Sequence, residues 1–165
     1  MATATKKKLE TNIGIEESDR EAIAGALSKL LADTYLTYIK SHNYHWNVTG
    51  PYFHSLHEMF EEQYTELATA VDEIAERIRI LGFRAPATYH EFMDLASVEE
   101  DEDAPEAMEM VRRLAESNEA IITTARQALK PAQSADDEAS VDLITQRLDA
   151  HSKAAWMLRA HLAES

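Results

Sequence analysis

Apolar residues recur at helical spacing in four long segments of the chain. In the first segment, leucine and isoleucine side chains repeat every three or four residues from Ile23 to about Trp46, which is the spacing of one face of an α-helix. The same pattern predicts helices over about 51–81, 105–129 and 134–162. Four segments of about 25 to 30 residues, each roughly 40 Å long as a helix, therefore predict an all-α protein.

Residues that favour helix ends lie at the boundaries of these segments. Ser18 or Asp19 is expected to cap the first helix, and Pro51 suits the first turn of the second. Gly82 is expected to end the second helix. Pro131 is expected to stop the third, because proline lacks a backbone N–H.

The connection over 82–105 is the longest of the three between the helices. Tyr89, Phe92 and Leu95 predict one short helix inside it. Two short connections and one long crossover are typical of a ferritin-like four-helix bundle, in which the second and third long helices run parallel. An up-down-up-down bundle is the alternative, but a connection of this length is unusual for it.

Composition supports this interpretation and narrows the function classes. A chain of 165 residues fits one domain, which we place at 16–165 after a flexible N-terminal tail, 1–15. Only four glycines and four prolines argue against a many-stranded β fold. With no cysteine, no apolar run long enough for a membrane span and no secretory signal, the chain is predicted to be cytoplasmic, with nucleoid association left open. A net charge of −14 repels nucleic acid and attracts cations.

Four potential metal ligands share one flank of the second helix. His57 and Glu61 are four residues apart, as are Asp72 and Glu76. At 100° per residue, all four fall within an arc of about 100° beside the apolar stripe. Acidic residues at this spacing also line ordinary solvated helix faces, so the arc by itself does not identify a metal site.

The spacing of the two pairs indicates a site shared between two copies of the chain. His57 and Glu76 lie about 28 Å apart along a helix, too far to bind one ion within one chain. Both the outer pair and the inner pair, Glu61 and Asp72, are centred on position 66.5. Antiparallel packing across a two-fold axis would therefore form two identical sites. With His45 as a second nitrogen donor, two imidazoles and three carboxylates suit iron or manganese.

The chain resembles the Dps mini-ferritins (DNA-binding proteins from starved cells), most strongly over 41–82. The resemblance is carried by His42–Gly50, Phe53, Leu56–Glu58, Phe60–Glu61, Asp72–Arg77 and Leu81–Gly82. A looser similarity extends from about 20 to 163. The resemblance to this family implies a hollow homododecamer that oxidises Fe(II), preferably with hydrogen peroxide, and stores ferric mineral. This activity would protect the cell from oxidative damage.

The resemblance also implies which residues bind the metal. Each inter-subunit ferroxidase site would hold two irons, or other divalent metals such as zinc. The implied ligands are His45, His57 and Glu61 of one subunit with Asp72 and Glu76 of its two-fold mate. Glu61 stands where many members have aspartate, and its extra methylene would either shift the second metal position or lengthen its bond, without removing a ligand.

Other residues have less specific patterns. Trp46 is a candidate to intercept stray oxidising equivalents in catalysis, with a plain interface aromatic as the alternative. By resemblance, Asp136, Asp137 and Asp142 lie near a three-fold pore that admits Fe(II), although acids also favour a helix N-terminus. His161 is either a further metal-binding nitrogen or a cation that stabilises the helix C-terminus.

Basic residues give only a weak indication of DNA binding. Lys6, Lys7 and Lys8 make a small basic patch, which twelve copies would strengthen by avidity. The few phosphate contacts would be weak at physiological salt. Two alternatives to an iron-oxidising store remain open: a nucleoid-compacting DNA-binding protein with incidental metal binding, and a helical scaffold with a solvated acidic face.

Overall fold

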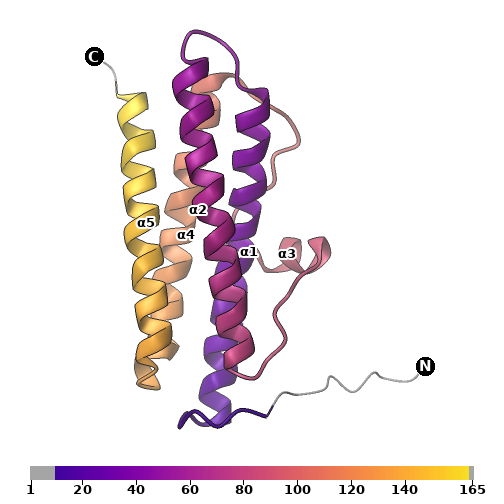
Figure 1. Ribbon diagram of the computed structural model, residues 1–165, viewed down its shortest axis with the longest axis vertical. Coiled ribbons are helices and arrows are strands. Elements are labelled where there is room, and N and C mark those ends of the chain that lie inside the picture. Colours follow the sequence, from indigo (N-terminus) through magenta and orange to yellow (C-terminus); the bar gives the residue numbers. More distant parts are fainter. Residues whose placement is uncertain (1–9, 164–165) are drawn as a thin grey trace, which may run out of the picture.

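Four long helices form a bundle with one short helix on its side (Figure 1). This computed structural model describes residues 10–163. The helices are α1 (Glu17–Asn47), α2 (Phe53–Ile80), α3 (Tyr89–Leu95), α4 (Ala107–Ser134) and α5 (Glu138–Leu162). The crossover that contains α3 returns along the length of the bundle, so α2 and α4 run parallel (Figure 1). The predicted all-α, ferritin-like arrangement is confirmed.

The helices share two apolar clusters that lie toward opposite ends of the bundle. In the larger cluster, Leu27, Ile74, Ile121 and Ile144 are each 0% exposed and come from the four long helices in turn. The smaller cluster contains these buried residues: Tyr44, Val48, Leu56, Phe60, Met110, Val111, Leu114, Ala115 and Leu158. Along α1, α4 and α5, buried polar residues separate the two clusters in sequence. The middle of the bundle therefore contains buried polar side chains from three of its four long helices.

Asp33 anchors the crossover to the bundle. Its side chain is 0% exposed, and its carboxylate accepts hydrogen bonds from the backbone N–H groups of Ser97 and Val98 at 2.5 and 2.9 Å. The hydroxyl of Thr124 on α4 donates to the same carboxylate at 2.6 Å. One buried anion thus joins α1, α4 and the segment that follows α3.

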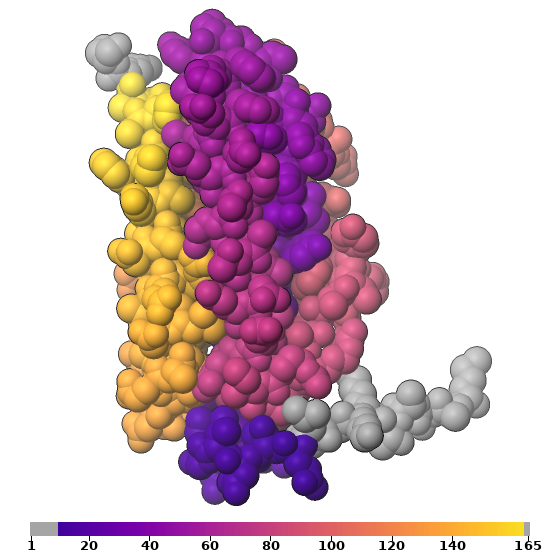
Figure 2. Space-filling model, in the orientation of Figure 1, coloured from indigo at the N-terminus to yellow at the C-terminus, as the bar shows by residue number. Residues whose placement is uncertain are grey.

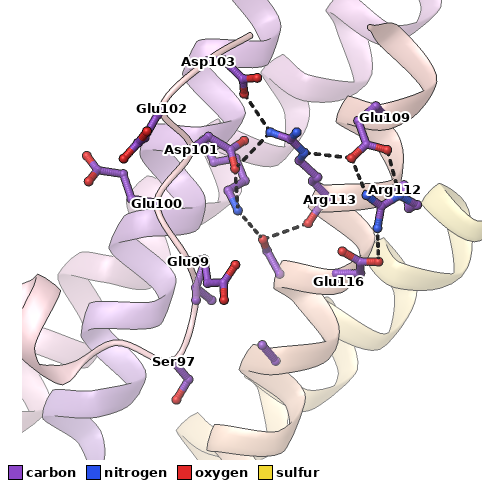
Figure 3. Close-up of a pocket in the computed structure, with 14 residues that line it drawn as sticks. Ser97, Glu99, Glu100, Asp101, Glu102, Asp103, Glu109, Arg112, Arg113 and Glu116 are labelled. Carbon is purple, nitrogen blue, oxygen red and sulfur yellow. Dashed lines mark hydrogen bonds and ion pairs between the residues drawn. The ribbon is translucent and has the colours of Figure 1, made fainter. Parts of the chain in front are cut away.

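A second polar cluster fixes the acidic part of the crossover (Figure 3). The buried ammonium of Lys40 lies 3.5 Å from Asp101 and donates to the hydroxyl of Ser117 at 3.0 Å. Tyr44 donates to the other oxygen of Asp101, and Arg113 pairs with Asp103 at 2.8 Å. Burial lowers the pKa of Lys40, and the carboxylate of Asp101 opposes that shift. The acidic run is therefore tied to α1 and α4.

Two predicted helix ends are wrong. Pro131 does not stop the third long helix, because it lies in the last turn of α4. The missing N–H of Pro131 removes one helical hydrogen bond, to the carbonyl of Gln127, and α4 ends three residues later at Ser134. Neither Ser18 nor Asp19 caps α1: Glu16 is the N-cap residue, and Asp19 lies in the first turn, where its charge suits the helix dipole.

Two other helix starts are displaced from their predicted positions. Pro51 lies in a turn before α2 rather than in its first turn, because α2 begins at Phe53. The last helix begins at Glu138 rather than near Ser134, because α4 continues to that serine. Gly82 follows α2 with φ of +96°, a conformation that favours glycine at a helix C-terminus, as predicted.

The segment 10–15 precedes α1 at one end of the bundle. The Thr11 hydroxyl donates to the backbone carbonyl of Ile80 at 3.0 Å, so this part of the predicted tail contacts the end of α2. Lys6, Lys7 and Lys8 lie outside the described residues. Within 10–163, no helix is long and apolar enough to cross a membrane.

Asp137 ties the start of α5 to α2. It is the N-cap residue of α5 and is 3% exposed. Its carboxylate accepts from Arg77 at 2.5 Å and from the backbone N–H and hydroxyl of Ser140 at 3.2 and 2.5 Å. Burial acts to raise the pKa of Asp137, but the hydrogen bonds from Arg77 and Ser140 outweigh it and place the pKa below its ordinary value.

We expect Asp137→Asn to lower the free energy of unfolding at pH 7 by about 2 kcal/mol, since the amide still caps α5 but loses the ion pair with Arg77. A carboxylate with a lowered folded-state pKa stabilises fully above its ordinary pKa of about 3.9, and the benefit is lost as pH falls through the lowered value. Urea unfolding at matched protein concentration should show the difference at pH 7 and its disappearance in acid. Equal stability at pH 7 would contradict this role.

Candidate metal centre

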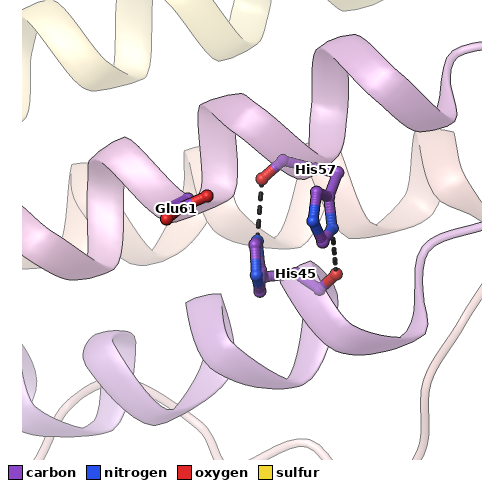
Figure 4. Close-up of side chains that lie close together, drawn as sticks. All are labelled: His45, His57 and Glu61. Carbon is purple, nitrogen blue, oxygen red and sulfur yellow. Dashed lines mark hydrogen bonds between the residues drawn. The ribbon is translucent and has the colours of Figure 1, made fainter.

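A tight turn brings the ends of α1 and α2 together. Val48 ends α1 with its side chain 2% exposed, and Gly50 takes φ of +102°, a conformation that side chains disfavour. The N–H of Phe53 then donates to the Gly50 carbonyl at 3.0 Å as α2 begins. This reversal places His45, near the end of α1, opposite His57, in the second turn of α2 (Figure 4).

The two histidines orient each other through reciprocal hydrogen bonds. Nδ1 of His45 donates to the backbone carbonyl of His57 at 2.8 Å, and Nδ1 of His57 donates to the carbonyl of His45 at 2.8 Å. The rings stack with centroids 3.8 Å apart. Because a carbonyl only accepts hydrogen bonds, each Nδ1 carries the proton and each Nε2 keeps a free lone pair. A hydrogen bond of this kind is typical of metal-binding histidines.

Glu61 completes a group of three potential ligands. One ligand atom from each of His45, His57 and Glu61 lies within 4.8 Å of the other two. His45 is buried, His57 is half-buried and Glu61 is exposed, so the group opens toward the surface of α2. Two imidazoles and one carboxylate leave coordination positions of a metal ion free for further ligands.

The structure does not bring the other two predicted ligands into this group. Asp72 and Glu76 are exposed near the opposite end of α2, and Glu76 is about 28 Å along the helix from His57. Between the two ends, α2 presents the small residues Thr65 and Ala68 to solvent. Figure 2 shows α2 uncovered along much of its length. Within one chain, three of the five predicted ligands therefore meet.

An aromatic cluster lies beside the histidines, and its central member, Tyr64, has no predicted role in the site. The Tyr64 ring lies 5.2 Å from His45 and 4.0 Å from His42, between ring centroids. Trp46 is 70% exposed and stacks on His42 at 4.9 Å. Burial lowers the pKa of His42, and the neighbouring His45 lowers it further. Tyr64 follows Glu61 by three residues, so its helical spacing is the signal that would have placed it here.

The other predicted site residues lie apart from this group. Asp136 and Asp142 are exposed at the start of α5, and Asp142 accepts from Gln146 at 2.8 Å. The carboxylate of Asp137 is instead engaged by Arg77 as the N-cap of α5. His161 is exposed in the last turn of α5, where a cation suits the helix dipole.

Comparisons with known proteins agree with this fold. A family model described as a ferritin-like domain matches residues 24–165. The chain is 41% identical over 136 residues to DNA protection during starvation protein 2 of Bacillus anthracis, which covers 82% of this chain and 93% of that protein. The chain belongs to the Dps family of ferritin-like proteins. The predicted family is confirmed.

Solved Dps structures match nearly the whole chain. A Dps protein from Vibrio cholerae O1, described as a member of the ferritin-like diiron-carboxylate superfamily, superposes with a TM-score of 0.88 at 30% identity, covering 98% of this chain and 100% of that one. A Dps protein from Bacillus brevis gives a TM-score of 0.85 at 36% identity, covering 88% and 98%. This Dps chain thus shares both fold and length with its relatives.

Proposed function

We propose that this Dps-family protein oxidises Fe(II) at sites shared between subunits and stores the ferric product inside a homododecamer. The observation that carries the proposal is the reciprocal hydrogen bonding of His45 and His57, which leaves two free Nε2 lone pairs beside the carboxylate of Glu61. Nitrogen donors combined with carboxylates suit iron. The diiron-carboxylate description of the Vibrio cholerae O1 relative supports the same chemistry.

A second copy of the chain would complete each site. Antiparallel pairing of two α2 helices about position 66.5 places Glu76 of the partner subunit against His57 and Asp72 of the partner subunit against Glu61. Small exposed side chains at Thr65 and Ala68 permit close approach of the helices there. Each dimer would then hold two identical sites, each with two imidazoles and three carboxylates.

The chemistry follows from two irons held together. Two Fe(II) ions each give one electron to hydrogen peroxide, the O–O bond breaks, and two protons are taken up to form two waters. Because the two irons together supply both electrons, peroxide is not left after a one-electron reduction, which would release a hydroxyl radical. The carboxylates offset the additional positive charge of Fe(III), while the Nδ1 hydrogen bonds keep both imidazoles oriented. Trp46 is a further proposed participant, because it is exposed and linked to His45 through His42 and Tyr64.

Charge favours collection of iron over binding of DNA. The net charge of −14 is multiplied in any assembly of the chain, which attracts cations and repels phosphates. Exposed Asp136 and Asp142 are the proposed pore residues through which Fe(II) enters. DNA binding is proposed to be weak, since phosphate contacts of a few lysines are lost at physiological salt.

Sizing and anaerobic oxidation test the proposal together. We expect the purified protein to elute as a dodecamer and to oxidise added Fe(II) when hydrogen peroxide is introduced, with about two Fe(II) consumed per peroxide, as the electron balance requires. Absorbance of the ferric product and residual Fe(II) measure this ratio. A monomer without turnover would contradict the proposal. Condensation of plasmid DNA by the metal-free protein, with no Fe(II) oxidation, would favour the nucleoid-compacting alternative.

A further inference from the structure

A cavity lies between α2 and α5. It contains none of the residues of the His45 centre, which is the group of His45, His57 and Glu61. Its volume is about 340 Å³. Glu62, Gln63 and Glu66 line it from α2, and Asp149 and His151 line it from α5. The two helices run side by side, with the seam between them on the face seen in Figure 2. The cavity belongs to a single chain, so neither assembly nor the proposed function is needed to form it.

The hydrogen bonds of His151 determine which ring nitrogen is free. His151 is 1% exposed, and its Nδ1 lies 2.8 Å from Oδ1 of Asn118. The amide nitrogen of Asn118 donates to the Leu114 carbonyl at 2.8 Å, which fixes the amide with its oxygen toward the ring. Nδ1 therefore carries the proton and Nε2 is a bare lone pair. Burial, with a smaller effect from Arg147, lowers the pKa of His151 to about 3, so the ring is neutral near pH 7.

Two buried electron-pair donors in this cavity lack partners. Among the described residues, neither Nε2 of His151 nor Oε1 of Gln63 has a hydrogen-bond partner, and the buried Nε–H of Arg147, which also has none, donates to neither of them. A buried polar atom without a partner destabilises the fold, because it has lost its hydrogen bond to water. Two acceptors cannot satisfy each other, so both require a positively polarised group. The ring of His151, held through Nδ1 with Nε2 free, repeats the arrangement of His45 and His57.

The charges around the cavity favour a cation over an anion. Glu62, Glu66 and Asp149 contribute three negative charges to the lining, against one positive charge from Lys153. Arg147 lies nearby and pairs with Glu66, so these two charges offset each other and the remaining balance is two negative charges, on Glu62 and Asp149, against one positive charge on Lys153. A small anion would therefore meet carboxylates and lone pairs, whereas a cation would meet neutralising charge.

We propose that this cavity binds a transition-metal ion of the borderline class, such as Co(II), Zn(II) or Fe(II). Nε2 of His151 and Oε1 of Gln63 are its protein donors, and water completes the coordination. Imidazole nitrogen selects this class over magnesium and calcium, which prefer oxygen alone. The site is distinct from the His45 centre in position and lies within one chain.

Crystals soaked in Co(II) test the proposal by position. We expect an anomalous difference peak about 2.1 Å from Nε2 of His151, the distance typical of nitrogen ligands. The peak should vanish in His151→Leu and remain in His161→Leu, which removes an exposed imidazole from the same helix. Water at that position in Co(II)-soaked wild-type crystals, or a peak that survives His151→Leu, would overturn the assignment.

A second variant, Gln63→Leu, tests the same site while the buried His151 stays in place. Gln63 is only half-buried, so its replacement should leave the thermal transition within a few degrees of wild type. We expect Co(II) affinity at this site to fall at least about 10-fold on loss of one ligand, measured by equilibrium dialysis in a His57→Ala background that disables the first centre. Unchanged affinity would overturn the role of Gln63.

Discussion

Co-expression of two inactive variants is expected to restore Fe(II) oxidation. His57→Ala and Asp72→Ala each damage every shared site, so each alone should oxidise Fe(II) at least about 10-fold more slowly, since even residues that merely orient metal ligands cost 10- to 100-fold. In a mixed dimer, one site receives intact His57 from one chain and intact Asp72 from the other. Random pairing makes half of the dimers mixed, each with one intact site of two, so about one quarter of wild-type activity should return.

The mixing experiment has a matched control on the same helix. Glu73 is exposed on α2 next to Asp72, but it lies outside the arc of predicted ligands, about 160° around the helix from His57. Glu73→Ala should therefore keep full activity alone. Differently tagged subunits allow mixed assemblies to be purified before peroxide-dependent oxidation is measured. No recovery in mixed assemblies, or full activity in Asp72→Ala alone, would show that the site is not shared across the α2 pair.

The sequence predicts the proximity of the candidate ligands where their arrangement is local. His57 and Glu61 are four residues apart on one helix, so their proximity follows from helix geometry alone. His45 joins them because Gly50 and Pro51 indicate a reversal between two antiparallel helices. The reciprocal hydrogen bonds from the rings of His45 and His57 to backbone carbonyls have no signal in the sequence, because every residue has a backbone carbonyl. The proton position on each ring is therefore learned only from the structure.

Contacts between distant helices are the part that sequence spacing does not predict. Asp33 lies among apolar residues of α1 and accepts from residues 64 to 91 positions away. His151 and Asn118 are 33 positions apart and meet only after α4 and α5 pack. A polar residue on an apolar face shows that a partner is required, but the partner depends on how the helices are rotated against one another. Pro131 is a different case, because its effect is local. The helix loses one backbone hydrogen bond at this proline and continues to Ser134.

Replacement of Asp33 is expected to cause the largest loss of stability. Asp33→Ala removes the acceptor for three hydrogen bonds and leaves two buried or half-buried backbone N–H groups, of Ser97 and Val98, without it. Hydrogen bonds to a charged group are worth about 1.5–3 kcal/mol each, and they are not additive here because they share one carboxylate. We expect the free energy of unfolding to fall by about 4 kcal/mol, which lowers Tm by roughly 8–16 °C in a chain of this size.

The structure also predicts where the Asp33→Ala protein will open. Since Asp33 holds the backbone just before the acidic run, its loss should loosen the start of that run at Glu99 and Glu100, while Asp101 and Asp103 stay paired with Lys40 and Arg113. A glutamate-specific protease reports this directly, because Glu99 and Glu100 lie in the segment, and cleavage there should begin before the helices are cut. Thr124→Val removes only the hydroxyl donor on α4 and should leave the crossover protected, at a cost of about 1 kcal/mol. Protection of the crossover in both variants would mean that it is held by the Lys40 and Asp101 cluster instead of by Asp33.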